Sequence, residues 1–226
     1  MRYSPSLRTI RTHSMSESIF DRIRAAEGTV LDRPTFHADS DREEEKLDGG
    51  VIWKLERAQF FNELDDPAWD AFIEGDWTRV LEIFTGEREW IRGEVARYAR
   101  RGLRFRRLRI VEDPPTPYLQ WESHSHRIFV ECGHDIRALD AAEVAGLERA
   151  AALPELMVYG DRVLYQVRYD EGWTPIGAKR VDDRDLVTEA AAAVAALWKR
   201  SEPFPDYFRR VISPLATPDT RRGDTR

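Results

Sequence analysis

A regular alternation of apolar and polar side chains marks the last third of the chain. Odd positions of Val163–Tyr169 carry Val or Tyr, and even positions carry Leu, Gln and Arg. A period of two distributes side chains over both faces of a strand. Residues 155–159 and Pro175–Val181 also have the composition of strands, and glycine-containing turns at residues 160–161 and 171–172 separate the three segments. We therefore predict three antiparallel strands connected as a meander.

A helical spacing of apolar positions follows the meander. Asp182 or Asp183 is a suitable capping residue, and a helix from there would end at Arg200. Its apolar stripe consists of Leu186, Val187, Ala190, Val194, Leu197 and Trp198. A stripe of this kind predicts an amphipathic helix packed on one face of the meander.

A helix followed by a strand is predicted in the middle of the chain. Residues 87–101 carry apolar side chains at positions i, i+4 and i+7, and Gly102 ends the helix. Leu103–Val111 follows at once as a strand. Helix, glycine and strand in this order are the repeating unit of α/β folds.

The segment of residues 118–132 allows two interpretations. Pro117 before it and Gly133 after it favour a helix, whereas the composition of residues 127–131 favours a strand. We favour the helix. Residues 51–59 fit a short strand or a helix equally well.

Capping residues, prolines and glycines predict the remaining helices and strands. Asp66 and Pro67 begin a helix that Gly75 ends. Further helices are expected at residues 78–84 and 140–152, and a strand at residues 135–139.

These elements predict an α/β fold, with a mixed sheet, a C-terminal antiparallel meander and packed helices. One domain should span residues 49–212. Residues 1–48 are expected to form an extension with a short helix near residues 18–27 and a solvated acidic linker at residues 39–48. Residues 213–226 are expected to be a disordered tail. We expect the domain to fold without residues 1–48.

Composition limits the classes of function. The chain of 226 residues has a net charge of −6, which argues against direct binding of nucleic acid. No apolar run approaches the roughly 18 residues that cross a bilayer, so we expect no membrane association. The single Cys132 excludes an intrachain disulfide and suits a reducing compartment. We expect a cytoplasmic protein.

Histidine and cysteine side chains raise a metal hypothesis. His124, His126, Cys132 and His134 are ligand types that zinc accepts. On a helix, however, His124 and His126 point to nearly opposite sides, so surface histidines and a small apolar thiol are the simpler interpretation. The chain also lacks a Gly-x-Ser-x-Gly motif, a phosphate-binding glycine-rich loop and a dinucleotide fingerprint. We predict no catalytic residue, metal or cofactor.

Basic and aromatic side chains provide a candidate binding surface. A surface for an anion or a protein partner would combine Arg104, Arg106, Arg107, Arg109, Trp121, His124 and Trp173. The alternative is that the arginines lie at a helix end and a sheet edge and pair with the abundant Glu and Asp side chains. The negative net charge favours the alternative for the arginines.

Three segments carry a family resemblance. They are WIRGEVARYARRGLRFRRLRIVEDPPTPYLQWE, ECGHDIRAL and PELMVYGDRVLYQVRYDEGWTPIGAKRVDD. Over residues 51–208 the chain resembles an actinobacterial domain family of unknown function (DUF6879-like), whose members are often encoded beside helix-turn-helix regulators. The resemblance implies a non-catalytic regulatory or protein-interaction module, with such a regulator as partner. The alternative is a small-molecule enzyme of specialised metabolism whose site no motif reveals.

The order of predicted elements also looks like a phospholipase-D-like module. Such enzymes place a His-x-Lys motif just before the strand that leads to an acidic turn, here at Asp161. Leu153 and Glu155 stand where His and Lys would fall. Neither can act as the nucleophile or hold phosphate charge. This resemblance implies a degenerate core without phosphodiesterase activity.

Overall fold

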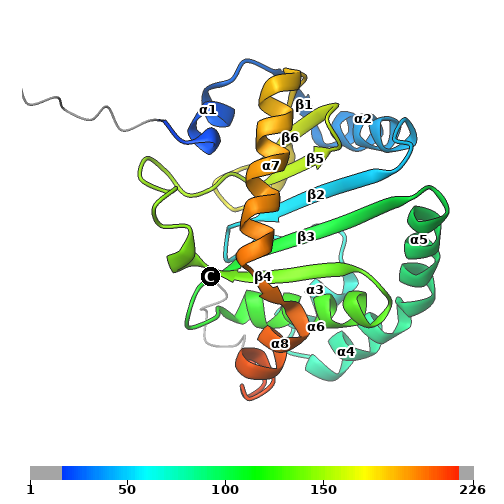
Figure 1. Ribbon diagram of the computed structural model, residues 1–226. Helices are drawn as coiled ribbons and strands as arrows, with labels where there is room; N and C mark the ends of the chain where they lie inside the picture. Colours follow the sequence, from blue (N-terminus) through cyan, green and yellow to red (C-terminus); the bar gives the residue numbers. More distant parts are fainter. Residues whose placement is uncertain (1–16, 219–226) are drawn as a thin grey trace, which may run out of the picture.

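An eight-stranded mixed sheet runs through the computed structural model, which describes residues 17–218 (Figure 1). The strand order is β1-β7-β6-β5-β2-β3-β4-β8. Strands β2, β3 and β4 are parallel neighbours, and every other pair is antiparallel. The strands are β1 (Thr29–Asp32), β2 (Gly50–Glu56), β3 (Leu103–Val111), β4 (Asp135–Asp140), β5 (Leu156–Tyr159), β6 (Val163–Tyr169), β7 (Pro175–Val181) and β8 (Glu202–Pro203).

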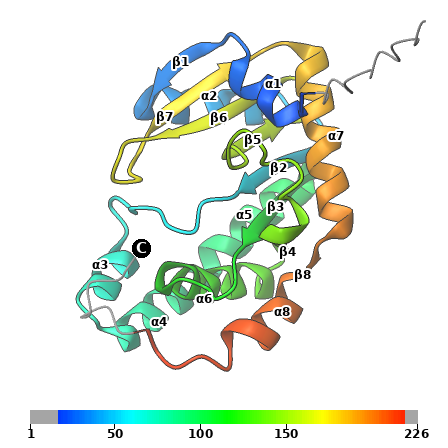
Figure 2. The same ribbon diagram turned by 90° about the vertical axis from the view of Figure 1, so that its left-hand side faces the viewer.

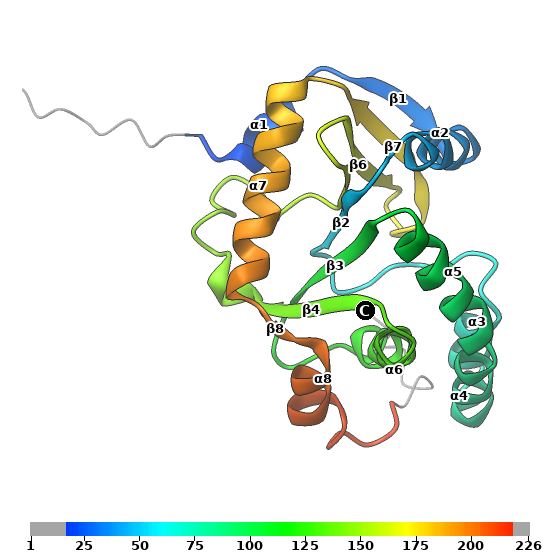
Figure 3. The ribbon, with the colours of Figure 1, turned by 45° about the vertical axis from the view of Figure 1, so that its right-hand side comes forward.

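Helices cover both faces of the sheet. They are α1 (Ile19–Ala25), α2 (Arg33–Glu45), α3 (Pro67–Ile73), α4 (Trp77–Gly86), α5 (Arg88–Arg100), α6 (Pro117–Glu131), α7 (Arg184–Arg200) and α8 (Phe204–Tyr207), with a 3₁₀ turn at Ala141–Glu143 and a π-helical turn at Phe208–Ile212. Figure 3 shows α7 on one side of the sheet and α2, α5 and α6 on the other. Among the helices of the described residues, none is both long and apolar enough to span a membrane.

Side chains that alternate along the strands pack against the helices on both faces of the sheet. On the α7 face, Trp53 of β2 and Leu108 of β3 belong to one buried cluster with Val194 of α7. On the opposite face, Ile52 of β2 packs in a second cluster with Phe36 of α2 and Tyr98 of α5. Adjacent residues of β2 therefore point into different layers, as a strand requires.

The α/β fold class is confirmed, and so are its clearest parts. Strands β5, β6 and β7 form the predicted meander, and α7 packs on it. Residues 51–59 contain a strand, β2. The segment 118–132 is a helix, because Thr116 accepts a hydrogen bond from the Leu119 amide and Pro117 occupies the first turn. A phospholipase-D-like core stays a prediction.

The predicted acidic linker is wrong. Residues 33–45 form helix α2, capped by the Asp32 side chain, and its Phe36 and Glu43 are buried. Glu43 pairs with Lys46, Arg162 and Arg180. Apolar residues are few in this segment, and ion pairs to the sheet help to hold it in place.

Parts of the predicted extension also join the main core. Phe20 and Ile23 of α1 are buried in the same cluster as α7, and β1 pairs with β7. Residues 1–16 of this extension, and residues 219–226 of the predicted disordered tail, lie outside the described residues. Residues 213–218 are described, and the Gln120 side chain donates a hydrogen bond to the carbonyl of Ala216 over 2.8 Å.

The predicted helix at residues 140–152 is also wrong. Only Ala141–Glu143 is helical, as a 3₁₀ turn capped by Asp140. The rest is an irregular connection to β5, although Val144 and Leu153 are buried against α7. Alanine favours helices locally, but propensity is a weak signal that tertiary packing overrides, and here Val144 and Leu153 pack on α7 from an irregular connection.

Candidate functional site

The predicted basic surface is divided by the alternation of β3. The guanidinium of Arg106 lies 5.4 Å from the ring of Trp53 and 5.3 Å from that of Trp198, on the α7 face. Arg107 and Arg109 point to the opposite face, toward α6, where they contact Glu56 and Glu122 respectively. Four arginines that are close in sequence therefore do not form one patch.

The aromatic members of that predicted surface also separate. Trp121 is buried among Trp69, Phe72 and Phe84, and Arg109 is fully buried, so neither lies on a surface. His124 packs edge-on against Trp77 and Phe208. Trp173 is exposed, and Arg104 is exposed at the start of β3. The seven residues do not make a common surface.

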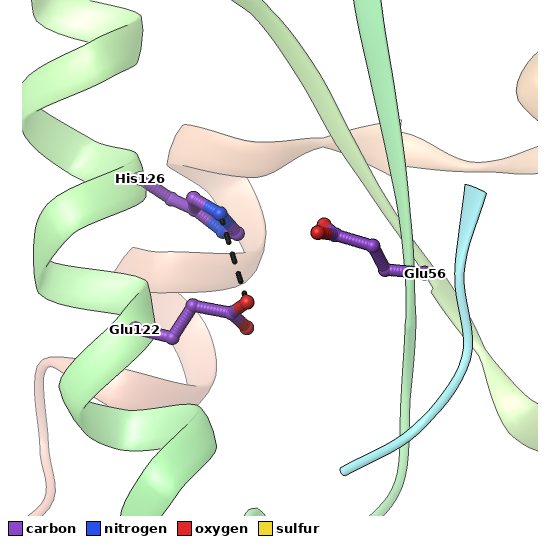
Figure 4. Close-up of side chains that lie close together, drawn as sticks. All are labelled: Glu56, Glu122 and His126. Atoms are coloured by element: carbon purple, nitrogen blue, oxygen red, sulfur yellow. Dashed lines mark ion pairs between the residues drawn. The ribbon is translucent and has the colours of Figure 1, made fainter. Parts of the chain in front are cut away.

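A buried ionic cluster lies between the ends of β2 and β3 and helix α6. Its members are Glu56, Arg107, Arg109, Glu122 and His126. Glu122 and His126 project from the same side of α6 toward Glu56 (Figure 4). Arg109 Nε donates to Glu122 Oε2 over 2.8 Å, and its Nη1 reaches the carbonyls of Glu56 and Ile110.

Arg107 joins the acidic and imidazole side chains of this cluster. Its Nη1 lies 3.1 Å from Glu56 Oε2 and 2.8 Å from His126 Nε2. Burial lowers the pKa of His126 well below its ordinary value, and the charge of Arg107 acts in the same direction. His126 is therefore neutral and accepts the hydrogen bond from Arg107.

The two glutamates of the cluster are shifted in opposite directions. Burial would raise the pKa of Glu56, but the charges of Arg107 and Lys54 outweigh burial and hold that pKa below its ordinary value. Burial raises the pKa of Glu122, and the charge of Arg109 offsets this only in part. Glu56 is therefore ionised, whereas Glu122 accepts a proton more readily than a glutamate in water.

The cluster contains ligand atoms for a metal ion but does not fit one as it stands. The ligand atoms of Glu56, Glu122 and His126 lie within 4.8 Å of one another. The guanidinium of Arg107 is within hydrogen-bonding distance of both His126 and Glu56. A divalent cation would have to displace it and would face the charge of Arg109 as well.

The four residues of the zinc hypothesis are not brought together. His126 belongs to the ionic cluster. His134 Nε2 lies 2.9 Å from Glu94, and Cys132 Sγ lies 3.7 Å from the carbonyl of Arg88. His124 is wedged between two aromatic rings. The residues that do cluster have a signal in the sequence, because Tyr118, Glu122 and His126 follow one another at intervals of four and share one face of α6.

Another buried glutamate, Glu155, fixes the loop that leaves β2. Glu155 accepts hydrogen bonds from the amides of Arg57, at 2.9 and 3.1 Å, and Ala58, at 2.7 Å. Burial raises the pKa of Glu155 to about 7, against the lowering effect of Arg109. Glu155 therefore anchors the first residues of the loop 57–66.

An open groove lies where this loop meets α3 and the β6–β7 turn. Figure 2 shows these three segments at its left-hand side. Its volume is about 730 Å³. The groove, here called the α3 groove, is lined by Phe60, Asn62, Glu63, Leu64, Asp65, Trp69, Asp70, Ile73, Glu74 and Gly172. Four of these ten residues are acidic and none is basic.

Exposed apolar side chains gather around the α3 groove. Leu64 is 41% exposed, Ile73 is 48% exposed, and the neighbouring Trp173 is 43% exposed. Trp173 packs against Tyr169 and Phe61 and holds the loop through a hydrogen bond from the Asn62 amide to its carbonyl, 3.0 Å long. Large apolar side chains left in water around a concave surface are typical of binding sites.

Strained backbone is concentrated at the same place. Asp65 has φ 58° and Trp173 has φ 62°, and they are the non-glycine residues with positive φ in the described part of the chain. For Trp this conformation costs about 1–3 kcal/mol. The strain is held by hydrogen bonds from the Gly172 and Thr174 amides to the Asp170 side chain.

The buried cluster reaches the α3 groove through Tyr118. Its hydroxyl donates to Glu63 Oε1 over 2.6 Å and lies 3.3 Å from Glu122 Oε1. Glu63 thus lines the groove while its position depends on a buried side chain of α6.

The fold and the site define an α/β protein with a closed ionic cluster beneath an acidic, apolar groove. The sequence matches the family described as a domain of unknown function (DUF6879) over residues 49–209, so the chain belongs to this family, as its resemblance indicated. A search of curated proteins found no match.

Proposed function

We propose that this protein is a non-catalytic regulatory module that binds a protein partner through the α3 groove. The observation that carries the proposal is the gathering of exposed Leu64, Ile73 and Trp173 around this groove. Each of these side chains costs free energy in water that a partner would recover. The strained backbone of Asp65 and Trp173 supports the same site, because strain of this kind concentrates at binding sites.

The ionic cluster supports a structural rather than a catalytic role for the interior. Glu56, Glu122 and His126 are all buried. Arg107 contacts Glu56 and His126 Nε2, and Arg109 contacts Glu122. A general acid or base must reach a substrate, and these three groups are buried.

A helix-turn-helix regulator is the partner that the family resemblance implies, and a cytoplasmic location belongs to the same proposal. DNA-binding proteins carry positively charged surfaces, and four carboxylates line the α3 groove. The rival proposal is a small-molecule enzyme. No specific observation on the described residues favours it over the interaction module.

Photo-crosslinking tests the proposal directly. A photoreactive phenylalanine replaces Ile73 or Leu64 in the full chain, expressed in the cells that naturally produce it. Both positions should give the same discrete adduct, identified by mass spectrometry, and the purified partner should bind the unmodified chain more tightly than an Ile73→Ser variant. Trp90, which is 63% exposed and outside the groove, is the matched control position.

Two results would contradict the proposal. One is an adduct formed equally well from position 90. The other is no adduct from either groove position together with turnover of a cell metabolite by the purified chain, which would establish the enzyme instead.

A further inference from the structure

We propose that the α3 groove takes a basic, apolar segment of its protein partner, one that carries Lys or Arg beside two or three large apolar side chains. This inference names the chemistry of the partner and rests on the proposed function.

Three of the four carboxylates that line the groove have no cationic partner among the described residues. Among the described residues, Asp65 pairs with Arg33 at 3.5 Å. Glu63, Asp70 and Glu74 have no Lys, Arg or His within 4.0 Å in that part of the chain. Three uncompensated carboxylates around one groove attract a cationic segment and repel an anionic one.

Several acidic side chains elsewhere in the described chain have cationic partners. The acidic helix α2 directs Asp39 and Glu43 to Arg180, and Glu44 to Arg97. Even the exposed Glu189 has a partner in Arg22. These acidic side chains are paired with cations, whereas three of the four that line the α3 groove have no Lys, Arg or His partner among the described residues.

Glu63 is held ready for a partner by the interior. Tyr118 donates to its Oε1, and Oε2 receives no hydrogen bond from the described residues. Tyr118 itself is fully buried, packed against Phe60, Phe61 and Trp69. The carboxylate is therefore fixed in direction with one oxygen free, an arrangement suited to a Lys or Arg side chain. Tyr118 is a positioning residue in this scheme.

The apolar part of the groove favours a partner segment that carries apolar side chains beside its basic ones. Leu64 and Ile73 alternate in sequence with the lining carboxylates, and Phe60 and Trp69 also line the groove. Burial of Leu64 and Ile73 needs apolar side chains from the partner. A phosphate backbone would meet four carboxylates, so nucleic acid does not fit this groove.

Fluorescence anisotropy with the full chain and three synthetic helical peptides of equal length tests the proposal. One peptide is basic and amphipathic with Lys and Leu, the second is acidic with Glu and Leu, and the third is basic with Gln in place of Leu. The first should bind best, and its affinity should fall as ionic strength rises, because surface charges are screened by salt. The other two should bind at least about tenfold more weakly.

Variants locate the binding. Asp70→Asn with Glu74→Gln should weaken the Lys–Leu peptide about tenfold, and Ile73→Ser about fivefold. Tyr118→Phe should also weaken binding of the Lys–Leu peptide and should leave binding of the Glu–Leu peptide unchanged. Glu89→Gln and Trp90→Ser, two exposed changes outside the groove, are the matched controls and should change nothing. Circular dichroism verifies that each variant is folded.

Each of the following results would overturn this proposal. Failure of the proposed function would give a different result. Equal binding of the acidic peptide would refute the charge requirement, and equal binding of the Lys–Gln peptide would refute the apolar one. Self-association that Ile73→Ser abolishes would make a second copy the occupant. If no peptide binds while Ile73 still crosslinks to a partner in cells, the basic segment is wrong and the interaction module stands.

Discussion

Arg109 Nε and Glu122 Oε2 are 2.8 Å apart in a part of the interior where both side chains are buried. Two charges removed from water need each other, because each left alone would bear its full desolvation penalty. This pair joins the parallel strands to α6, and α6 in turn carries Tyr118 to the α3 groove. The position of Tyr118 at the groove, and the free energy of unfolding, should therefore depend on the pair of Arg109 and Glu122.

Removing one charge of this pair should destabilise the protein strongly. Arg109→Met leaves Glu122 buried without its partner, and we expect the free energy of unfolding to fall by about 3–5 kcal/mol. Urea denaturation followed by circular dichroism measures the change. Arg104→Met, on the same strand but exposed, is the control and should change it by about 0.5 kcal/mol or less. Equal effects of the two variants would contradict a special role for the buried pair.

Arg107 should decide whether the ionic cluster binds a metal. Its guanidinium lies at the ligand atoms of Glu56 and His126. We expect the unmodified chain to bind no stoichiometric zinc, and Arg107→Ser to bind about one zinc ion per chain, since two carboxylates, one imidazole and water suit zinc. Elemental analysis after dialysis against zinc measures this. Adding His126→Ala to Arg107→Ser should abolish binding, and stoichiometric zinc in the unmodified chain would refute the argument.

The sequence predicted best those elements whose signals are local. The alternation in Val163–Tyr169 and the apolar stripe of α7 correspond to the meander and its covering helix. Pro117 and Gly133 correctly favoured a helix for α6. Helix α2 was missed because its buried Glu43 is stabilised by Lys46 and Arg180. Arg180 is distant in sequence, and no local pattern shows such a pair.

The candidate site could be predicted only in part, for the same reason. The helical face of Tyr118, Glu122 and His126 is visible in the sequence. Their partners on β2 and β3 depend on strand pairing, which no local signal gives. The α3 groove combines a loop, a helix and the β6–β7 turn, whose proximity follows from the order of the sheet. Of the residues in and around this groove, only Trp173 belonged to the predicted binding surface.

The packing of α1 against α7 argues against our expectation that the domain folds without residues 1–48. Phe20 is 1% exposed and lies in the core with α7. Phe20→Ala should lower the free energy of unfolding by about 3–5 kcal/mol because it leaves a cavity. Val30→Ala in β1, where the side chain is 60% exposed, is the control and should cost about 0.5 kcal/mol or less. Thermal and urea unfolding of both variants measure the difference, and a silent Phe20→Ala would restore the idea of an independent extension.

Glu155 should make stability depend on pH. Its pKa is about 7 in the folded chain and 4.5 for the ordinary group. The folded state therefore holds the proton more tightly than the unfolded state. The contribution to stability is complete below about pH 4.5 and is lost as pH rises through 7, on the order of 3 kcal/mol in all.

Glu155→Gln removes this ionisation but keeps an oxygen that accepts from the Arg57 and Ala58 amides. Its free energy of unfolding, measured by urea denaturation between pH 5 and 8, should fall less with rising pH than that of the unmodified chain. The variant should therefore gain relative stability at pH 8. Glu171→Gln, in the exposed β6–β7 turn, should keep the slope of the unmodified chain. Parallel curves for Glu155→Gln and the unmodified chain would show that Glu155 does not titrate in this range.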